Sequence, residues 1–162
     1  VAKEEGMIRK NADSLSQVSR VKADMVLNHF DSIKTKKILY SISDEYYFVV
    51  LKVDCCYKEY YIQTDSVGNF KKEKVLKTSQ HDRKLLAKSF DLNNYHKDFI
   101  TRVDSATAIQ GNPSYFVVKD TDGKRYGEYA LSVITVPVPI DKKLYNYLLK
   151  RLLKESTINN VP

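Results

Sequence analysis

The sequence predicts an α+β fold, in which a single antiparallel sheet of about six strands, a meander plus a hairpin, carries helices packed mainly on one face. Four strand-like runs follow one another between residues 37 and 77, with connections too short for anything but antiparallel pairing. Amphipathic helical segments precede this block, follow it and close the chain. With 162 residues and no internal repeat or linker, residues 1–162 are expected to form one domain, of which 1–12 is a flexible N-terminal segment.

The first helix is expected over residues 14–33. Ser14 and Gln17 have the spacing of a capping box, in which each end of the motif satisfies a backbone group of the other. His29 lies on or beside the apolar stripe of this helix, and we interpret it as a histidine at the edge of the core rather than a ligand. The stripe itself recurs at helical spacing: Leu15, Val18, Val21, Met25, Val26 and Phe30.

The meander is expected to contain four strands, over 37–42, 46–53, 59–64 and 70–77. The second is almost wholly apolar, which is typical of a central strand covered on both faces. The fourth is rich in lysine, which indicates a sheet edge protected against pairing with other chains. Residues 54–58 are expected to connect two strands and to carry both cysteines, Cys55 and Cys56, whose adjacency makes a disulfide between them strained.

Two further helices follow. Ser79 and Asp82 form a helix start signal, which predicts a short helix over about 80–90. Residues 95–112 are expected to be mostly irregular, with a helical turn near Asp98. Asp141 is expected to cap the last helix, and Leu148 and Leu152 of that helix are expected to pack on Phe116, Tyr129 or Leu131 of the hairpin.

The hairpin spans residues 114–134 and is expected to turn at Asp122 and Gly123, a pair typical of a two-residue type I′ turn. Gly127 has no side chain to pack, which indicates a bulge or the close approach of another element. An apolar face results from Phe116, Val118, Tyr129, Leu131 and Val133. The turn sets these residues opposite one another: Asp120 and Arg125 as an ion pair, Val118 and Gly127, Phe116 and Tyr129, Ser114 and Leu131.

The other face of the hairpin is half polar and is the candidate partner-binding face. Its candidate residues are Tyr115, Lys119, Tyr126 and Glu128. If no helix covers this face, two aromatic rings, one cation and one anion form a rigid contact surface of the kind that proteins use to bind partners. The alternative is that a helix or the meander covers the face, and that these tyrosines, two of the 12 in the chain, are ordinary packing.

No catalytic, cofactor-binding or metal-binding residue is predicted. The three histidines, His29, His81 and His96, have no metal-ligand spacing, and two cysteines alone cannot build a four-ligand zinc site. The sequence contains no nucleophile elbow, Walker loop or H-E-x-x-H motif. It therefore favours a non-enzymatic binding or accessory domain, with a protein or a small ligand as partner, over a hydrolase with an unfamiliar site.

The net charge of +7 raises a second class of function, the binding of nucleic acid or another anionic surface. However, the 27 basic residues are mixed with 20 acidic ones, a pattern more typical of a solubility feature than of a binding stripe, so nucleic acid is not favoured. No apolar run approaches the length of a membrane-spanning helix.

Several segments resemble uncharacterised small exported proteins of gut Bacteroidales. They are SYFVVKD at 114–120, DGKRYGEY at 122–129, VPVPID at 136–141, LYNYLLKRL at 144–152, ADMVLNHF at 23–30 and FDLNNYHKDFIT at 90–101. The resemblance implies export to the periplasm or the cell surface, and it carries over no activity, cofactor or catalytic residue. The chain starts with Val rather than Met, so we expect something upstream, either a removed signal peptide or residues that were left out. Adjacent thiols fit an oxidising compartment less well.

Overall fold

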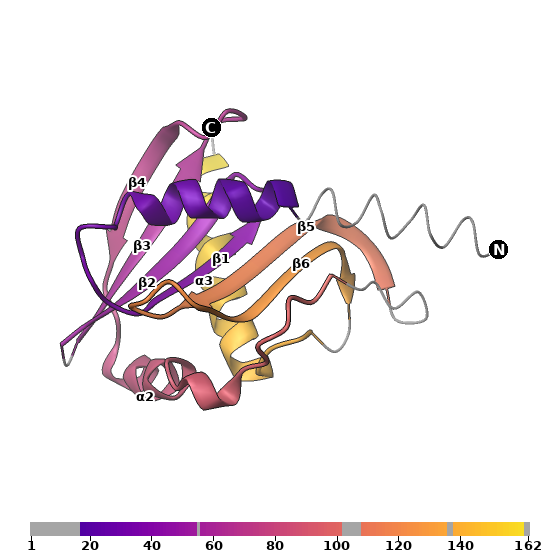
Figure 1. Ribbon diagram of the computed structural model, residues 1–162. Helices are drawn as coiled ribbons and strands as arrows, with labels where there is room; N and C mark the ends of the chain where they lie inside the picture. Colours follow the sequence, from indigo (N-terminus) through magenta and orange to yellow (C-terminus); the bar gives the residue numbers. More distant parts are fainter. Residues whose placement is uncertain (1–16, 55, 102–107, 136–137, 161–162) are drawn as a thin grey trace, which may run out of the picture.

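A single antiparallel sheet of six strands organises the computed structural model, which describes residues 17–54, 56–101, 108–135 and 138–160. The strand order is β4-β3-β2-β1-β5-β6, so a meander of four strands continues into a hairpin beside β1 (Figure 1). The α+β class and the predicted topology are therefore confirmed. The strands are β1 (Lys37–Ile42), β2 (Tyr46–Val53), β3 (Cys56–Thr64), β4 (Phe70–Leu76), β5 (Ala108–Lys119) and β6 (Arg125–Thr135).

The helices form two outer layers with the sheet between them. A first helix over residues 17–28 crosses one face of the sheet, and α2 (Gln80–Ser89) and α3 (Lys142–Asn160) lie on the other (Figure 1). Two of the three helices thus share a face. Each face has its own core, and β2 contributes to both, since Phe48 and Val50 belong to one cluster and Tyr47 and Val49 to the other. The expectation that this strand is covered on both faces is confirmed.

Four elements begin or end away from their expected positions. The first helix ends at residue 28 rather than 33, and its expected start at Ser14 lies outside the described residues. Strand β3 begins at Cys56, which is exposed, so Cys56 lies in a strand rather than in the predicted connection, while Cys55 lies outside the described residues. Strand β5 begins at Ala108, within a segment expected to be irregular, because β6 extends to Thr135 and provides a pairing partner there. The predicted turn near Asp98 is replaced by a 3-10 helix, η1 (Leu92–Asn94).

The predicted helix caps of α2 and α3 are confirmed. The Ser79 side chain accepts a hydrogen bond from the Asp82 amide at the start of α2. The Asp141 carboxylate accepts one from the Leu144 amide, at 3.1 Å, at the start of α3. Both contacts satisfy amides that have no partner within the first turn of a helix.

Helix α3 lies across the meander as well as the hairpin. Its Tyr145 ring meets Tyr40 of β1 edge to face, with centroids 6.1 Å apart. Farther along, Glu155 forms an ion pair of 3.1 Å with Lys74 of β4. Leu148 and Leu152 are fully buried in one cluster with Phe116, Tyr129 and Leu131, as expected of the apolar side of this helix.

The hairpin tip differs from the predicted two-residue turn. The Gly123 amide donates to the Asp120 carbonyl at 3.0 Å, and the Asp120 amide donates to the Lys124 carbonyl at 2.9 Å. Gly123 is left-handed, with φ of +86°, whereas Asp122 is not, so the loop is a three-residue turn ending in a glycine bulge. One extra loop residue sets Lys119 opposite Arg125. The predicted Asp120–Arg125 pairing is therefore wrong.

The two edges of the sheet are treated differently. Strand β4 is one edge, and the residues from Phe70 to Val75 are exposed, which confirms the edge position predicted from its lysines. Strand β6 is the other edge, and residues 96–100 run along its outer side. Three backbone hydrogen bonds join them: Gly127 N to His96 O (2.7 Å), Ile100 N to Glu128 O (3.0 Å) and Ala130 N to Ile100 O (3.1 Å).

Candidate binding surface around the first helix

The hairpin face that was expected to bind a partner lies under helix 17–28. Tyr115 is 0% exposed and Glu128 is 3% exposed. Lys119 lies on the same face, with about a fifth of its side chain exposed. Tyr126 lies on the opposite face of the sheet, where it packs against the α3 cluster. An open aromatic surface was expected only if no helix covered this face. The first helix covers it and buries Tyr115, so the alternative, in which this tyrosine is ordinary packing, is the one that the structure has. The expectation that Tyr126 shares this face is wrong.

A bulge at Gly127 explains why Tyr126 lies on the other face. The pairing passes from Phe116 opposite Tyr129 to Val118 opposite Tyr126, so β6 has one residue more than β5. Gly127 is left-handed, with φ of +62°, and a Cβ there would come within 2.5 Å of the Tyr95 ring. The bulge and the close approach predicted at Gly127 are both confirmed. The extra residue also turns Arg125 toward the first helix.

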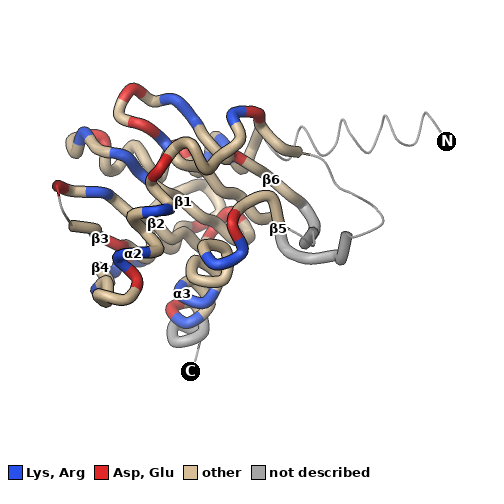
Figure 2. Tube along the Cα trace, turned by 90° about the horizontal axis from the view of Figure 1, so that it is seen from below, with Lys and Arg blue, Asp and Glu red and all other residues tan. Residues whose placement is uncertain are grey.

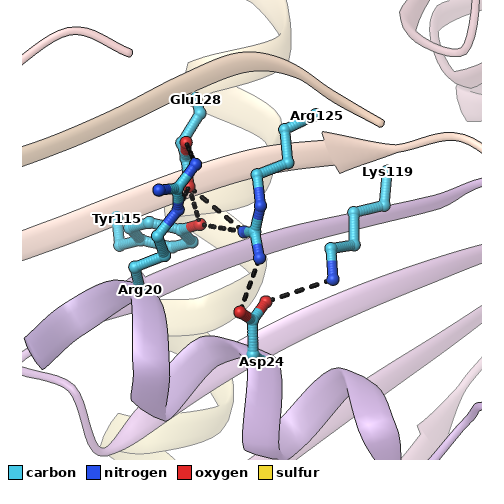
Figure 3. Close-up of polar contacts among 6 residues, drawn as sticks. All are labelled: Arg20, Asp24, Tyr115, Lys119, Arg125 and Glu128. Carbon is cyan, nitrogen blue, oxygen red and sulfur yellow. Dashed lines mark hydrogen bonds and ion pairs between the residues drawn. The ribbon is translucent and has the colours of Figure 1, made fainter. Parts of the chain in front are cut away.

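A buried carboxylate, Glu128, is the centre of a polar network under the helix (Figure 3). Arg20 of the helix grips it with two hydrogen bonds, Nε to Oε2 at 3.0 Å and Nη2 to Oε1 at 2.8 Å. Arg125 donates to Oε2 at 3.2 Å, and the Tyr115 hydroxyl also donates to this oxygen. Fork-like pairing of this kind holds two elements in one orientation.

Asp24, one helical turn after Arg20, extends the network toward the hairpin tip. It accepts a hydrogen bond of 2.5 Å from Arg125 and forms an ion pair of 3.2 Å with Lys119 (Figure 3). Arg125 thus bridges a carboxylate of the helix and a carboxylate of the sheet. The network joins the first helix to a hairpin about a hundred residues later in the chain.

The protonation states of Tyr115 and Arg125 indicate that this network holds the helix to the sheet and is not a reaction centre. Burial, followed by the charge of Glu128, raises the pKa of the Tyr115 phenol above its ordinary value. Burial alone would lower the pKa of Arg125, but the hydrogen bond to Asp24 and the nearby acids raise it. Neither group exchanges a proton near neutral pH, and the two oxygens of Glu128 already accept four hydrogen bonds from three side chains.

A second buried carboxylate, Glu59 of β3, lies on the α3 side of the sheet. It is 0% exposed and accepts hydrogen bonds from the hydroxyls of Thr78 and Tyr147. Arg151 of α3 lies 3.4 Å from it and also donates to the Lys77 carbonyl at 3.0 Å. This arrangement ties α3 to the end of β4, and it too is closed to a substrate.

A groove of about 470 Å³ lies between α2 and the start of α3, a size that suits a small ligand. Its polar side chains include Lys88, His96 and Asp141. Asp141 already caps α3, and the hydroxyl of Tyr95, which also lines the groove, donates to the Ser89 carbonyl. The groove therefore has few polar groups that converge on a common point.

The most distinctive feature of the exterior is an apolar surface beside the first helix. Four of its members, Val18, Val21, Met25 and Val67, line one shallow groove of about 380 Å³. Phe70 continues it onto β4 and contacts the His29 ring, with centroids 4.7 Å apart. We define the apolar surface as these six residues, given with their exposed fractions: Val18 (45%), Val21 (58%), Met25 (46%), Val67 (71%), Phe70 (36%) and Val75 (67%).

The apolar stripe predicted for the first helix is buried only in part: Val26 and Phe30 belong to the core as expected, whereas three other members do not. Val18, Val21 and Met25 recur at helical spacing but point outward. The buried side consists of Ala23, Val26, Leu27 and Phe30, which also recur at helical spacing. The roles of Arg20 and Asp24 were missed as well. Their spacing of four residues on a side adjoining the buried one is the only signal that the sequence offers for them.

No family model, curated protein or solved structure matches this chain. Among the described residues, no three His, Cys, Asp or Glu side chains are grouped so that they could hold a metal ion. In the same part of the chain, no helix has the length and apolar character needed to cross a membrane.

Proposed function

We propose that this chain is a non-enzymatic protein-binding domain of an exported bacterial protein, and that its partner covers the apolar surface beside the first helix. One observation carries the proposal. Of the seven large hydrophobic side chains exposed in the described part of the chain, six belong to this surface. The exported setting rests on the resemblance of the sequence segments given above.

The clustering of these residues is what points to a partner. Single exposed hydrophobic residues are ordinary, but contiguous apolar patches on soluble domains mark interaction sites. Val18, Val21 and Met25 repeat along one side of the helix, and Val67 comes from the β3–β4 turn to meet them. Covering a fully exposed side chain of this kind contributes about 1.5–3 kcal/mol. These side chains are partly buried already, so each contributes about half of that, and several of them together can hold a partner.

Val75 belongs to the same side of the molecule. It pairs with Tyr60 across β3 and β4, and Tyr60 packs against the core beneath the first helix. Val75 is nevertheless 67% exposed, so the first helix does not cover it. A partner seated beside the helix would cover both the outer side of the helix and this strand.

Two other functions have less support. Binding to an anionic surface rests on the net charge of +7, but Lys and Arg are mixed with Asp and Glu over the chain (Figure 2). A hydrolase needs an accessible reactive group, and the two buried carboxylates, Glu59 and Glu128, are already occupied by neighbouring donors. Retention on heparin that falls steeply with salt would favour the first of these alternatives.

The test begins with a photoreactive amino acid at Val21 and, as a control, at the exposed Lys150 on α3. Irradiation in the producing cells, followed by mass spectrometry, should identify a partner joined at position 21 and not at 150. The affinity of the purified partner is then measured by titration calorimetry for two variants. The double variant Val21→Ser and Met25→Ser should weaken binding at least tenfold, whereas Leu153→Ser, which removes the exposed hydrophobic residue outside the surface, should change it less than twofold. Equal affinity of all three proteins would reject the proposal.

A further inference from the structure

We propose that β4 receives an extended, acidic segment of the partner, which adds to the sheet as a seventh strand. This inference rests on the proposed function and deepens it, because it names the secondary structure and the charge of the part that binds. It is carried by the difference between the two sheet edges, by the charge of β4 and by the continuity of β4 with the apolar surface.

A comparison of the two sheet edges shows which of them can accept a strand from a partner. Residues 96–100 cover the outer side of β6 through three backbone hydrogen bonds. In the described part of the chain, the sheet order ends at β4, and nothing comparable runs along its outer side. An open edge presents backbone donors and acceptors in a row, and an added strand satisfies them.

The positive charge of β4 indicates that the partner segment is acidic. Lys71, Lys72 and Lys74 are exposed along seven residues of strand, and the one acid among them, Glu73, is paired with His29 at 3.4 Å. Lys74 forms an ion pair with Glu155 of α3 at 3.1 Å. An acidic strand laid beside β4 would set carboxylates opposite the lysines, and opposite charges in cross-strand pairs stabilise a sheet.

The same charges disfavour a second copy of this chain. If two β4 strands paired antiparallel about Glu73, Lys72 of one would face Lys74 of the other. Glu73 would face its own counterpart. Like charges directly opposite each other destabilise a sheet. In this register the lysines of β4 disfavour pairing with a second copy, as edge lysines usually do, while they attract an acidic strand.

The apolar surface gives the added strand a second source of affinity. Phe70 and Val75 lie at the two ends of the exposed part of β4 and are 36% and 67% exposed. Side chains alternate along a strand, so an acidic segment with apolar residues at every second position could place those residues on the side of the first helix. A nucleic acid or a lipid headgroup would meet the lysines but could not form the backbone ladder.

A synthetic peptide tests the inference with the intact chain. The probe is a fluorescent nine-residue peptide of alternating Glu and Val, acetylated and amidated, and its binding is followed by anisotropy. Reversing two charges on β4, Lys71→Glu with Lys72→Glu, should raise the dissociation constant at least tenfold. The matched reversal at the exposed start of α3, Lys142→Glu with Lys143→Glu, should change it less than twofold. Circular dichroism should show both variants folded.

Two further measurements separate strand addition from general attraction. Amide hydrogen exchange in β4 should slow when the peptide binds. Two further peptides are N-methylated at alternate residues, so that each lacks the backbone donors along one of its two edges. One of these two should not bind, because it has lost the donors that pair with β4. Equal binding of all three peptides, no slowing of exchange in β4, or equal binding to both charge-reversed variants would each overturn the inference. If anionic phospholipid vesicles displace the peptide and amide exchange in β4 does not slow, the peptide is attracted by charge alone. That result would also overturn the inference.

The outcomes also distinguish this inference from the proposed function. If the peptide fails while the double variant at Val21 and Met25 still loses the cross-linked partner, the apolar surface binds a partner without strand addition. If the peptide pairs with β4 while that double variant keeps its partner, the strand inference holds and the apolar surface is not the binding site.

Discussion

Arg20 and Glu128, 108 residues apart in the chain, meet in a two-pronged ion pair between the first helix and the hairpin. About a third of the Arg20 side chain is exposed, but Glu128 is almost wholly buried. The pair therefore connects a solvent-accessible cation to a carboxylate that cannot reach water. This difference in exposure determines how much the free energy of unfolding would fall if Arg20 were removed.

Replacing Arg20 by Ala should lower the free energy of unfolding by about 1–3 kcal/mol, because a buried carboxylate loses its best donor. The loss should be smaller than for a fully buried pair, since Arg20 is partly screened by water and Arg125 and Tyr115 still donate to Glu128. Urea denaturation measures it. The neighbouring change Lys22→Ala is the control and should alter stability by less than about 0.5 kcal/mol. A similar loss in both variants would mean that the ion pair contributes nothing specific.

Gly127→Ala should be more destabilising than Gly123→Ala, although both glycines are left-handed. A side chain at either position costs about 1–2 kcal/mol in backbone strain. At Gly123 a Cβ meets nothing within 4 Å, whereas at Gly127 it would lie 2.5 Å from the Tyr95 ring. Overpacking adds about 1–3 kcal/mol at Gly127. Thermal or urea unfolding of the two variants compares these costs, and equal losses would contradict the close approach of Tyr95.

Leu148→Ala should lower the free energy of unfolding by about 2–5 kcal/mol, because Leu148 is fully buried between α3 and the sheet. The control, Leu153→Ala, lies five residues later on the same helix and is 47% exposed, so it should cost less than about 1 kcal/mol. Both changes have the same effect on helix propensity, and their difference isolates core packing. A loss below about 0.5 kcal/mol for Leu148→Ala would mean that the helix packs elsewhere.

The buried tyrosines should make the protein unfold in alkali. Burial raises the pKa of six of them well above the ordinary value of 10.0: Tyr40, Tyr47, Tyr95, Tyr115, Tyr129 and Tyr147. A raised pKa in the folded state stabilises the protein fully below the unfolded value of about 10, and this contribution is lost as the pH rises beyond it. Absorbance at 295 nm should therefore report these phenolates in the same steep transition in which circular dichroism is lost. If all 12 tyrosines ionised near pH 10 while the circular dichroism spectrum stayed that of the folded protein, their burial would be contradicted.

The sequence by itself determined the class of fold, the order of its elements and the caps of α2 and α3. Local signals suffice for these features. Ser79 and Asp141 begin helices because they satisfy backbone amides next to them in the chain. The apolar run from Tyr46 to Val53 predicts a central strand because both of its faces must be covered. The lysines of β4 predict an edge, since they are poorly tolerated elsewhere in a sheet.

Only the tertiary structure decided which faces are covered. One extra residue at Gly127 exchanges the faces of Tyr126 and Arg125. The glycine indicated a bulge or a close approach, but it did not show which side chains would change face, because that depends on the pairing with β5 and on the approach of Tyr95. The first helix has two apolar stripes, and the side that packs is chosen by the sheet beneath it and by the reach of Arg20 and Asp24 to the hairpin. The exposed stripe of Val18, Val21 and Met25 follows from that choice. Periodicity shows that residues share a face, but contacts between segments far apart in the chain determine whether that face is buried.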